Sequence, residues 1–234
     1  SGCKGLILQN QFKASSYEKM ITELCPQVAD SAPGELCSPK LKNLTTVISL
    51  TESAIGGIYG WSDFVDLAKC TTDEELENRQ RDQNPDDAIN IQYTSGTTGF
   101  PKGATLSHHN ILNNGYFVAR IMNFTEEDRL VVPVPLYHCF GMVMANLGCL
   151  THGACAIYPS EGFDPEAVLE AVEKEKATAL FGVPTMFIAE LALPNFPKYD
   201  LSTLRTGIMA GAPCPVETMK QAVSYTHLTL PTPG

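Results

Sequence analysis

Residues 164–183 read Asp-Pro-Glu-Ala-Val-Leu-Glu-Ala-Val-Glu-Lys-Glu-Lys-Ala-Thr-Ala-Leu-Phe-Gly-Val, and this stretch predicts a capped helix followed by a buried strand. Asp164 is suited to the helix N-cap, and Pro165 is suited to the first helical position. The apolar residues that follow recur at helical spacing, which predicts one buried helix face. Residues 178–183 then form a short apolar run that Pro184 ends, as expected of a strand inside a sheet.

The same alternation of strands and helices continues on both sides of this stretch. Further strands are expected at 5–9, 44–50, 89–93, 154–158 and 206–210, and further helices at about 109–121 and at 185–193. A capping box is expected at 15–18, at the start of a first helix. Because successive strand–helix–strand units imply right-handed parallel crossovers, the sequence predicts an α/β protein with mostly parallel sheets flanked by helices.

Composition limits the possible classes of function. The chain has 234 residues, of which 44% are apolar and 18% charged, so it can bury a core and is not a disordered tail. Its net charge of −10 lacks the basic footprint of a nucleic-acid-binding protein. The most apolar stretch, 141–158, is interrupted by polar residues, which predicts a buried core segment and no membrane span. The acidic stretches 72–87 and 161–176 are typical of solvated helix faces or polar connectors.

The eight cysteines indicate a reducing compartment. No two of them are closer than six positions, so the chain has no Cys-x-x-Cys pair of the redox or zinc type. A disulfide framework is typical of smaller, secreted and loop-rich chains. We therefore expect reduced thiols, several of them filling the core, in a cytosolic or organelle-matrix protein.

The segment most informative about function is residues 93–103, Tyr-Thr-Ser-Gly-Thr-Thr-Gly-Phe-Pro-Lys-Gly, directly after a predicted strand. Glycines let backbone amides approach an anion, hydroxyls donate hydrogen bonds, and a lysine supplies compensating charge. A polyphosphate is the ligand that this chemistry suits. In a parallel sheet, ligands bind outside the carboxyl ends of strands, where the loops after Thr94 and Ala210 are expected. The candidate phosphate-binding residues are Thr94, Ser95, Gly96, Thr97, Thr98, Gly99 and Lys102.

Two other interpretations of this loop stay open. An ordinary flexible turn is also rich in glycine, serine and threonine. The phosphate-binding loop of a P-loop NTPase requires Gly-x-x-x-x-Gly-Lys followed by Ser or Thr. Here Lys102 follows Pro101 and precedes Gly103, so that spacing fails.

Three further segments lie in the second half of the chain: 135–141 (Pro-Leu-Tyr-His-Cys-Phe-Gly), 183–187 (Val-Pro-Thr-Met-Phe) and 211–213 (Gly-Ala-Pro). Taken alone, His138 is typical of a hydrogen-bonded core histidine, and the prolines are typical of turns. Cys139 is not expected to form a nucleophilic pair with His138, because neighbours on an extended segment point to opposite sides. The pair at 108–109 is interpreted as the start of a helix.

Together and in this order, the segments resemble the motifs of the adenylate-forming enzymes, which include acyl-CoA synthetases and luciferases. The resemblance covers about residues 1–223 and implies part of the AMP-binding N-terminal domain of an ATP-dependent acid–thiol ligase. Such an enzyme forms an acyl-adenylate from a fatty acid and ATP, and CoA then displaces AMP. The resemblance implies that Lys102 and the glycine-rich loop bind ATP phosphates, with Mg²⁺ held through those phosphates. It also implies catalytic roles for Lys102 and His138, with His138 beside the acyl pocket and with Gly211, Ala212 and Pro213 against the adenine.

The sequence also departs from the family pattern. The magnesium-binding Glu, the ribose-binding Asp and the C-terminal domain with its catalytic lysine have no counterpart after residue 223. The threonine- and proline-rich residues 224–234 are expected to be a non-native tail. We therefore expect a fragment, truncated at both ends and inactive alone; a non-catalytic nucleotide-binding or interaction fragment is the alternative. Similarity to mitochondrial medium-chain members of the family implies that the protein lies in the mitochondrial matrix. The cytoplasm is the alternative compartment.

Overall fold

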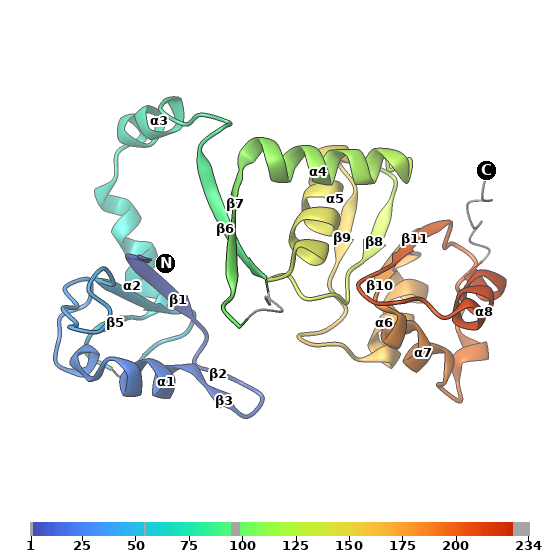
Figure 1. Cartoon of the computed structure of the whole chain (residues 1–234), viewed down its shortest axis with the longest axis horizontal. Helices are drawn as coiled ribbons and strands as arrows, with labels where there is room; N and C mark the ends of the chain where they lie inside the picture. The colour runs from blue at the N-terminus through green and yellow to red at the C-terminus, as the bar shows by residue number, and fades with distance from the viewer. Residues whose placement is uncertain (1, 54, 95–98, 227–234) are drawn as a thin grey trace. The chain divides into compact units, whose positions relative to one another are not determined.

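The chain divides into two compact units, residues 1–83 and 84–234, which we describe separately. The structure is a computed structural model that describes residues 2–53, 55–94 and 99–226 (Figure 1). Each unit contains a parallel sheet with helices packed against it. This confirms the predicted α/β class with mostly parallel sheets flanked by helices.

A three-stranded parallel sheet organises the first unit. Its strands, in spatial order, are β1 (Gly5–Leu8), β4 (Thr46–Ser49) and β5 (Ile58–Tyr59). Helix α1 (Tyr17–Leu24) and the 3-10 turn η1 (Pro26–Ala29) supply the other side of a small core. The buried residues of this core are Leu8, Ile21, Cys25, Val28, Leu36, Leu44, Val47 and Ile58.

The start of α1 differs from the prediction. Ser16 is the N-cap, and its hydroxyl accepts a hydrogen bond from the Lys19 amide at 3.4 Å. Ser15 lies in the hairpin of β2 (Gln11–Phe12) and β3 (Ser15–Ser16). The capping box expected at 15–18 is therefore wrong, because the helix starts one residue later and places a lysine where a Glu would have to reach back.

The acidic stretch at 72–87 contains an exposed helix, as predicted. Helices α2 (Trp61–Asp66), η2 (Leu67–Cys70) and α3 (Asp73–Arg81) follow β5 in turn. The Thr72 hydroxyl accepts from the Glu75 amide at 3.2 Å, and the Glu75 carboxylate accepts from the Thr72 amide at 2.9 Å. This capping box starts α3, in which no residue is buried. Local capping and charge therefore stabilise α3, because it has no buried face.

A four-stranded parallel sheet organises the second unit. Its strands, in spatial order, are β11 (Thr206–Met209), β10 (Ala179–Gly182), β8 (Arg129–Val131) and β9 (Cys155–Ile157). The helices along this part of the chain are α4 (His108–Ile121), α5 (Gly148–His152), α6 (Pro165–Glu175), α7 (Pro184–Leu191) and α8 (Val216–Thr226), with the short turn η4 (Phe196–Lys198) after α7. The strands predicted at 154–158, 178–183 and 206–210 and the helices predicted at 109–121 and 185–193 are all confirmed, with ends that differ by at most two residues.

The central strand β10 is buried on both faces of the sheet. Leu180 packs into one core with residues of α6 and α7, whereas Ala179 and Phe181 pack into a second core on the other face. Phe181 stacks on Phe140 there, with ring centroids 5.4 Å apart. Alternate side chains of one strand thus fill two cores, which explains why residues 178–183 are apolar throughout.

Helix α6 forms as its sequence predicts. The Asp164 carboxylate accepts from the amides of Glu166 and Ala167 at 3.0 and 3.2 Å, and Pro165 occupies the first helical position. The apolar stripe of α6 is fully buried. At the other end of the unit, α8 extends to Thr226, three residues into the segment expected to be a tail. Residues 227–234 lie outside the described residues, so the nature of that segment stays a prediction.

The apolar stretch after residue 140 is a buried core segment, as predicted. A π-helix, η3 (Phe140–Leu147), runs directly into α5. It lies so close to α4 that a Cβ on Gly115 would come within 2.9 Å of both the Leu147 Cβ and the Val143 carbonyl oxygen. Across the described residues, we find no helix with the length and apolar character needed to span a membrane.

The predicted strand at 89–93 exists, but it is not part of a parallel sheet. Strand β6 (Ala88–Thr94) pairs antiparallel with β7 (Lys102–Ser107) as a two-stranded ribbon. A parallel crossover needs a dozen or more residues, and only residues 95–101 separate the two strands. The glycine-rich loop therefore closes a hairpin, and its expected position at the carboxyl end of a parallel strand is wrong.

Candidate functional site

Three loops leave the carboxyl edge of the four-stranded sheet. The loops after β8 and β11 contain His138 and the Gly-Ala-Pro turn, respectively, whereas after β10 only Val183 precedes helix α7, which begins with Pro184 and Thr185. These three strands are neighbours in the sheet. Because parallel strands end at the same edge, the loops from neighbouring strands lie next to each other, which is where such sheets bind ligands.

The loop after β8 holds the His138 ring through its own backbone. The His138 Nδ1 accepts a hydrogen bond from the Phe140 amide at 3.1 Å, and the His138 amide donates to the Pro135 carbonyl at 3.2 Å. The Met142 amide then donates to the His138 carbonyl at 2.9 Å, which begins the helical turns. Gly141 permits this close turn, because a Cβ there would lie 2.5 Å from the Pro135 carbonyl oxygen. His138 is exposed, so it is not a core histidine.

Cys139 lies beside the imidazole, contrary to the expected geometry. Its Sγ is 3.7 Å from the His138 Nδ1, because the segment is a turn and not an extended strand. The reason given for expecting no nucleophilic pair is therefore wrong, and the absence of such a pair stays a prediction. The Phe140 amide donates to the same Nδ1 at 3.1 Å, so the thiol shares that nitrogen with a backbone donor.

The Gly-Ala-Pro turn after β11 is shaped by the backbone of Gly211. This glycine has φ +90°, a left-handed conformation that residues with a side chain rarely adopt. A Cβ there would also lie 3.2 Å from the Val183 Cγ1, so the turns after β10 and β11 touch at this point. The Ala210 amide donates to the Gly182 carbonyl at 3.2 Å and joins the two loops further. Gly211, Ala212 and Pro213 are all exposed.

The ribbon brings the two ends of the glycine-rich loop together. Thr94 faces Lys102 across the last register position, and the Thr94 hydroxyl lies 3.5 Å from the Lys102 carbonyl oxygen. Gly99 has φ +103°. Gly103 allows the strands to approach, since a Cβ there would lie 2.9 Å from the Ile91 Cγ2. Lys102 is exposed and, among the described residues, has no carboxylate within ion-pair distance.

The predicted site residues therefore fall into two groups. Thr94, Gly99 and Lys102 meet at the hairpin end, whereas His138 and residues 211–213 line the carboxyl edge of the sheet. Figure 1 shows the hairpin end and the carboxyl end of β8 on the same side of the second unit, opposite α4. No hydrogen bond or ion pair between described residues links the groups. The predictions for Ser95, Gly96, Thr97 and Thr98 fall on residues outside the described part.

The amino edge of the same sheet contains a network that the sequence did not reveal. The Arg205 guanidinium donates to the Asp128 carboxylate at 2.6 and 3.0 Å, and the Thr178 hydroxyl donates to the same carboxylate at 2.6 Å. Arg205 also donates to the carbonyls of Met122 and Asn123. Burial alone would raise the pKa of Asp128, but the hydrogen bonds from Arg205 and Thr178 outweigh it and hold that pKa below its usual value.

This network ties the strands together one residue before they begin. Asp128, Thr178 and Arg205 directly precede β8, β10 and β11. The Asp128 carbonyl also accepts from the Cys155 amide at 2.8 Å, at the start of β9. The three side chains are up to 77 positions apart in sequence, so no local spacing signals their contact. They are positioning residues that hold the sheet from the edge opposite the candidate site.

Residues 7–229 match the family described as "AMP-binding enzyme". The chain belongs to this family, which confirms the resemblance to adenylate-forming enzymes. It is 49% identical over 223 residues to the putative acyl-CoA synthetase YngI of Bacillus subtilis, covering 95% of this chain and 40% of that protein. It is 43% identical to the mitochondrial medium-chain acyl-CoA ligase ACSF2 of Danio rerio, covering 95% of this chain and 37% of that protein.

The fold is similar to that of a solved family structure. The anthranilate CoA ligase AuaEII, in complex with anthranoyl-AMP, matches with a TM-score of 0.74 at 21% identity, over 97% of this chain and 40% of that one. The chain thus spans about two fifths of the length of each of these three proteins. The described residues include no group of three or more His, Cys, Asp or Glu side chains that could hold a metal ion.

Proposed function

We propose that this chain is part of the AMP-binding N-terminal domain of an ATP-dependent acid–thiol ligase that converts a fatty acid to its acyl-CoA. The observation that carries the proposal is the hairpin end. There a glycine- and hydroxyl-rich loop is closed between Thr94 and Lys102 in a chain of the AMP-binding family. Both acyl-CoA relatives span far more residues than this chain, so we assign the activity to the longer protein and expect the chain alone to be inactive.

In the proposed reaction, the fatty carboxylate attacks the α-phosphate of ATP. An acyl-adenylate and pyrophosphate form, and the CoA thiol then displaces AMP to give the acyl-CoA. Lys102 would neutralise charge that develops on the pyrophosphate, together with backbone amides and hydroxyls of the loop from Thr94 onward. Mg²⁺ would enter with the nucleotide, held by phosphate oxygens, and would add further positive charge at the leaving group.

The acyl group and the base would lie at the carboxyl edge of the sheet. His138 is exposed there, and its neighbours Leu136 and Tyr137 expose apolar side chains, with Tyr137 84% exposed. Apolar surface of this kind suits an alkyl chain better than water. The turn at 211–213 would face the adenine, since all three of its residues are exposed at this edge of the sheet. These placements rest on the family resemblance and on the exposure of the residues.

The substrate and the compartment also remain proposals. The ACSF2 relative is named a medium-chain acyl-CoA ligase and mitochondrial, whereas the YngI relative is a bacterial protein. We propose a medium-chain fatty acid as substrate. The mitochondrial matrix remains the proposed compartment, with the cytoplasm as the alternative.

The ribbon argues against a P-loop NTPase. A Walker loop leads directly into a helix, whose N-terminus helps to bind the phosphates. Here the loop leads into strand β7, and helix α4 begins only at His108. A non-catalytic nucleotide-binding or interaction fragment remains the second candidate, because the chain spans only part of its relatives.

The test is a chimera. The segment of D. rerio ACSF2 that matches this chain is replaced by residues 1–226, and fatty-acid-dependent exchange of pyrophosphate into ATP is measured. The proposal predicts exchange that requires both ATP and a fatty acid, followed by acyl-CoA formation when CoA is added. A folded chimera that binds ATP but catalyses neither step would support the non-catalytic alternative.

A further inference from the structure

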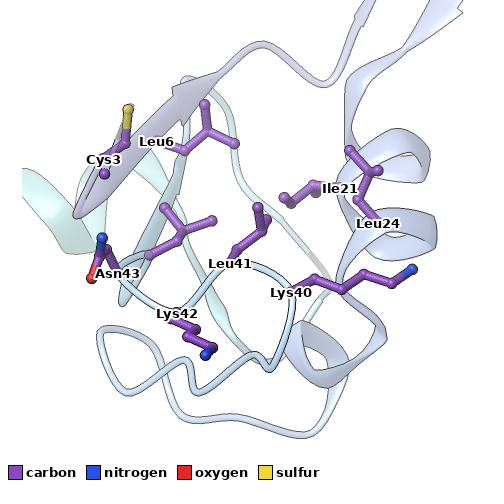
Figure 2. A pocket seen from close by; sticks show the side chains of 10 residues that line it. Cys3, Leu6, Ile21, Leu24, Lys40, Leu41, Lys42 and Asn43 are labelled. Atoms are coloured by element: carbon purple, nitrogen blue, oxygen red, sulfur yellow. The ribbon is translucent and has the colours of Figure 1, made fainter.

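We propose that the first unit contains a binding site for a single-chain fatty acid anion, formed between β1, α1 and the loop at 40–44. This site uses residues of 1–83 only and requires neither ATP nor the ligase activity proposed above. A hollow of about 500 Å³ lies there, within the range of small-molecule sites in proteins. Figure 2 shows Leu6 and Leu41 in this hollow, with Ile21 and Leu24 on the helix beside them.

The hollow has an apolar floor that continues along the helix. Ile21 is 3% exposed and forms part of the first core, whereas Leu6, Leu24 and Leu41 are 37, 56 and 36% exposed. A second hollow of about 320 Å³ shares Leu6, Ile21 and Leu24 with the first and extends to Met20. The two hollows are therefore adjacent and share an apolar wall. An alkyl chain suits such a surface because each methylene that it places there leaves water.

The loop that carries the charged rim is fixed by its own hydrogen bonds. The Leu41 amide donates to the Ser38 hydroxyl at 3.3 Å, and the Leu44 amide donates to the Leu41 carbonyl at 2.9 Å. These bonds close the turn at residues 38–44, and the buried Leu44 anchors its end in the core. A pre-formed loop reduces the entropy that a ligand must overcome on binding.

Charge complementarity identifies the head group. Lys40 and Lys42 both line the hollow, and both are exposed. Neither has a carboxylate within 4.0 Å among the described residues, although the chain carries a net charge of −10. Figure 2 shows both side chains extending from the same loop at the edge of the apolar hollow. Figure 2 shows the two side chains diverging, with that of Lys40 running toward α1 and that of Lys42 pointing away from the hollow. An apolar hollow with ammonium groups on its rim suits a carboxylate on an alkyl chain.

The experiment is a titration of the chain with decanoate below its critical micelle concentration, without nucleotide, followed by amide NMR. We expect one decanoate per chain, with shift changes confined to β1, α1 and residues 38–44. Octanoate should bind about fifteenfold more weakly, since each buried methylene contributes about fourfold. Decan-1-ol and decyltrimethylammonium, which lack the anionic head, should bind at least several-fold more weakly than decanoate.

Two pairs of variants separate the charged rim from the apolar floor. The double variant Lys40→Gln, Lys42→Gln should reduce the affinity for decanoate about fivefold and leave the affinity for decan-1-ol unchanged. The control double variant Lys13→Gln, Lys69→Gln should change neither affinity. Leu24→Ser should reduce the affinity for both ligands. The control Leu67→Ser, at a leucine that is 43% exposed and lies outside the proposed site, should reduce neither affinity. These side chains are all exposed, so the variants should fold.

Several outcomes would overturn the proposal. Equal binding of decanoate and decyltrimethylammonium would show a generic apolar surface. Binding only to anionic phospholipid vesicles, with no shift by free decanoate, would assign the site to a membrane surface. Self-association of the chain that Leu24→Ser abolishes, without decanoate binding, would assign the site to a second copy of the chain.

Discussion

The two edges of the four-stranded sheet differ in how side chains use them. At the amino edge, the buried Asp128 carboxylate accepts hydrogen bonds from Thr178 and from the exposed Arg205, and this network joins the starts of the strands. At the carboxyl edge, glycines shape the loops, and the candidate side chains His138 and Pro213 remain exposed. The sheet is thus held from one edge, which leaves the other edge accessible to ligands. Changes at the amino edge should reduce stability, and changes at the carboxyl edge should reduce function.

The largest loss of stability from a single substitution is expected from Arg205→Ala. The Asp128 carboxylate is 3% exposed and would lose two hydrogen bonds from a charged partner. Because the Arg205 side chain is itself 41% exposed, we expect a loss of about 1.5–3 kcal/mol of unfolding free energy, less than for a fully buried pair. Urea unfolding measures this difference, with Arg120→Ala on the exposed face of α4 as the control. A loss no larger than that of the control would show that the network does not hold the amino edge.

A second effect on stability, which depends on pH and accumulates over several pH units, is expected from Glu190. This residue is 3% exposed and lies near the end of α7. Apolar side chains of the core between α6, α7 and β10 surround it. Burial raises its pKa to about 8, from an ordinary value of 4.5. Between those values the folded chain keeps a proton that the unfolded chain has lost. Stability should therefore fall by about 1.4 kcal/mol per pH unit as the pH rises from about 5 to 8.

The matched variants are Glu190→Gln and, as a control on the exposed face of α6, Glu170→Gln. Unfolding free energies between pH 5 and 9 should lose this slope in Glu190→Gln and keep it in Glu170→Gln. Identical slopes in both variants and the parent chain would contradict a buried, protonated Glu190.

Gly211→Ala tests the carboxyl edge and should cost less stability than Arg205→Ala. The left-handed backbone of Gly211 penalises a Cβ by about 1–2 kcal/mol, and the added methyl would press on Val183. Nucleotide affinity should fall more than stability, because the turn would have to move. The control is Gly153→Ala, also at positive φ but at the end of α5, which should cost similar stability and leave nucleotide affinity unchanged.

The smallest effect on stability is expected from His138→Ala. The ring is exposed, and its hydrogen bond from the Phe140 amide lies at the surface, so the loss should stay within about 0.5 kcal/mol. Chemical unfolding measures it. A loss of several kcal/mol of unfolding free energy would show that His138, like the amino-edge network, acts mainly in stabilising the fold.

Much of the fold could be predicted because it depends on local patterns. Helix α6 combines an N-cap, a proline and an apolar stripe, and the buried strand β10 is ended by Pro184. The ribbon was not predicted, because strand β7 has a mixed pattern that indicates no buried face. Only the length of the loop at 95–101 could have shown that β6 and β7 pair antiparallel.

The candidate site was predictable as motifs, but its surroundings were not. The residue types of the loop at 93–103 predict phosphate binding, and this role stays a prediction. The contact of Gly211 with Val183 and the network of Arg205 join segments that are distant in sequence, so no periodicity reveals them. The contact between His138 and Cys139 was missed because the segment is a turn, in which neighbouring side chains can converge.

The most direct test of the central claim is Lys102→Ala in the ACSF2 chimera, compared with Lys69→Ala. Lys102 is the only cation in the sequence from Tyr93 to Gly103 and is exposed at the hairpin end. We expect fatty-acid-dependent pyrophosphate exchange to fall by about 10²-fold or more, with unfolding free energy unchanged, because one charged contact to the transition state is lost. Lys69→Ala should exchange normally. Exchange kinetics in Lys102→Ala equal to those of the unmodified chimera would contradict the assignment of this hairpin to ATP phosphates.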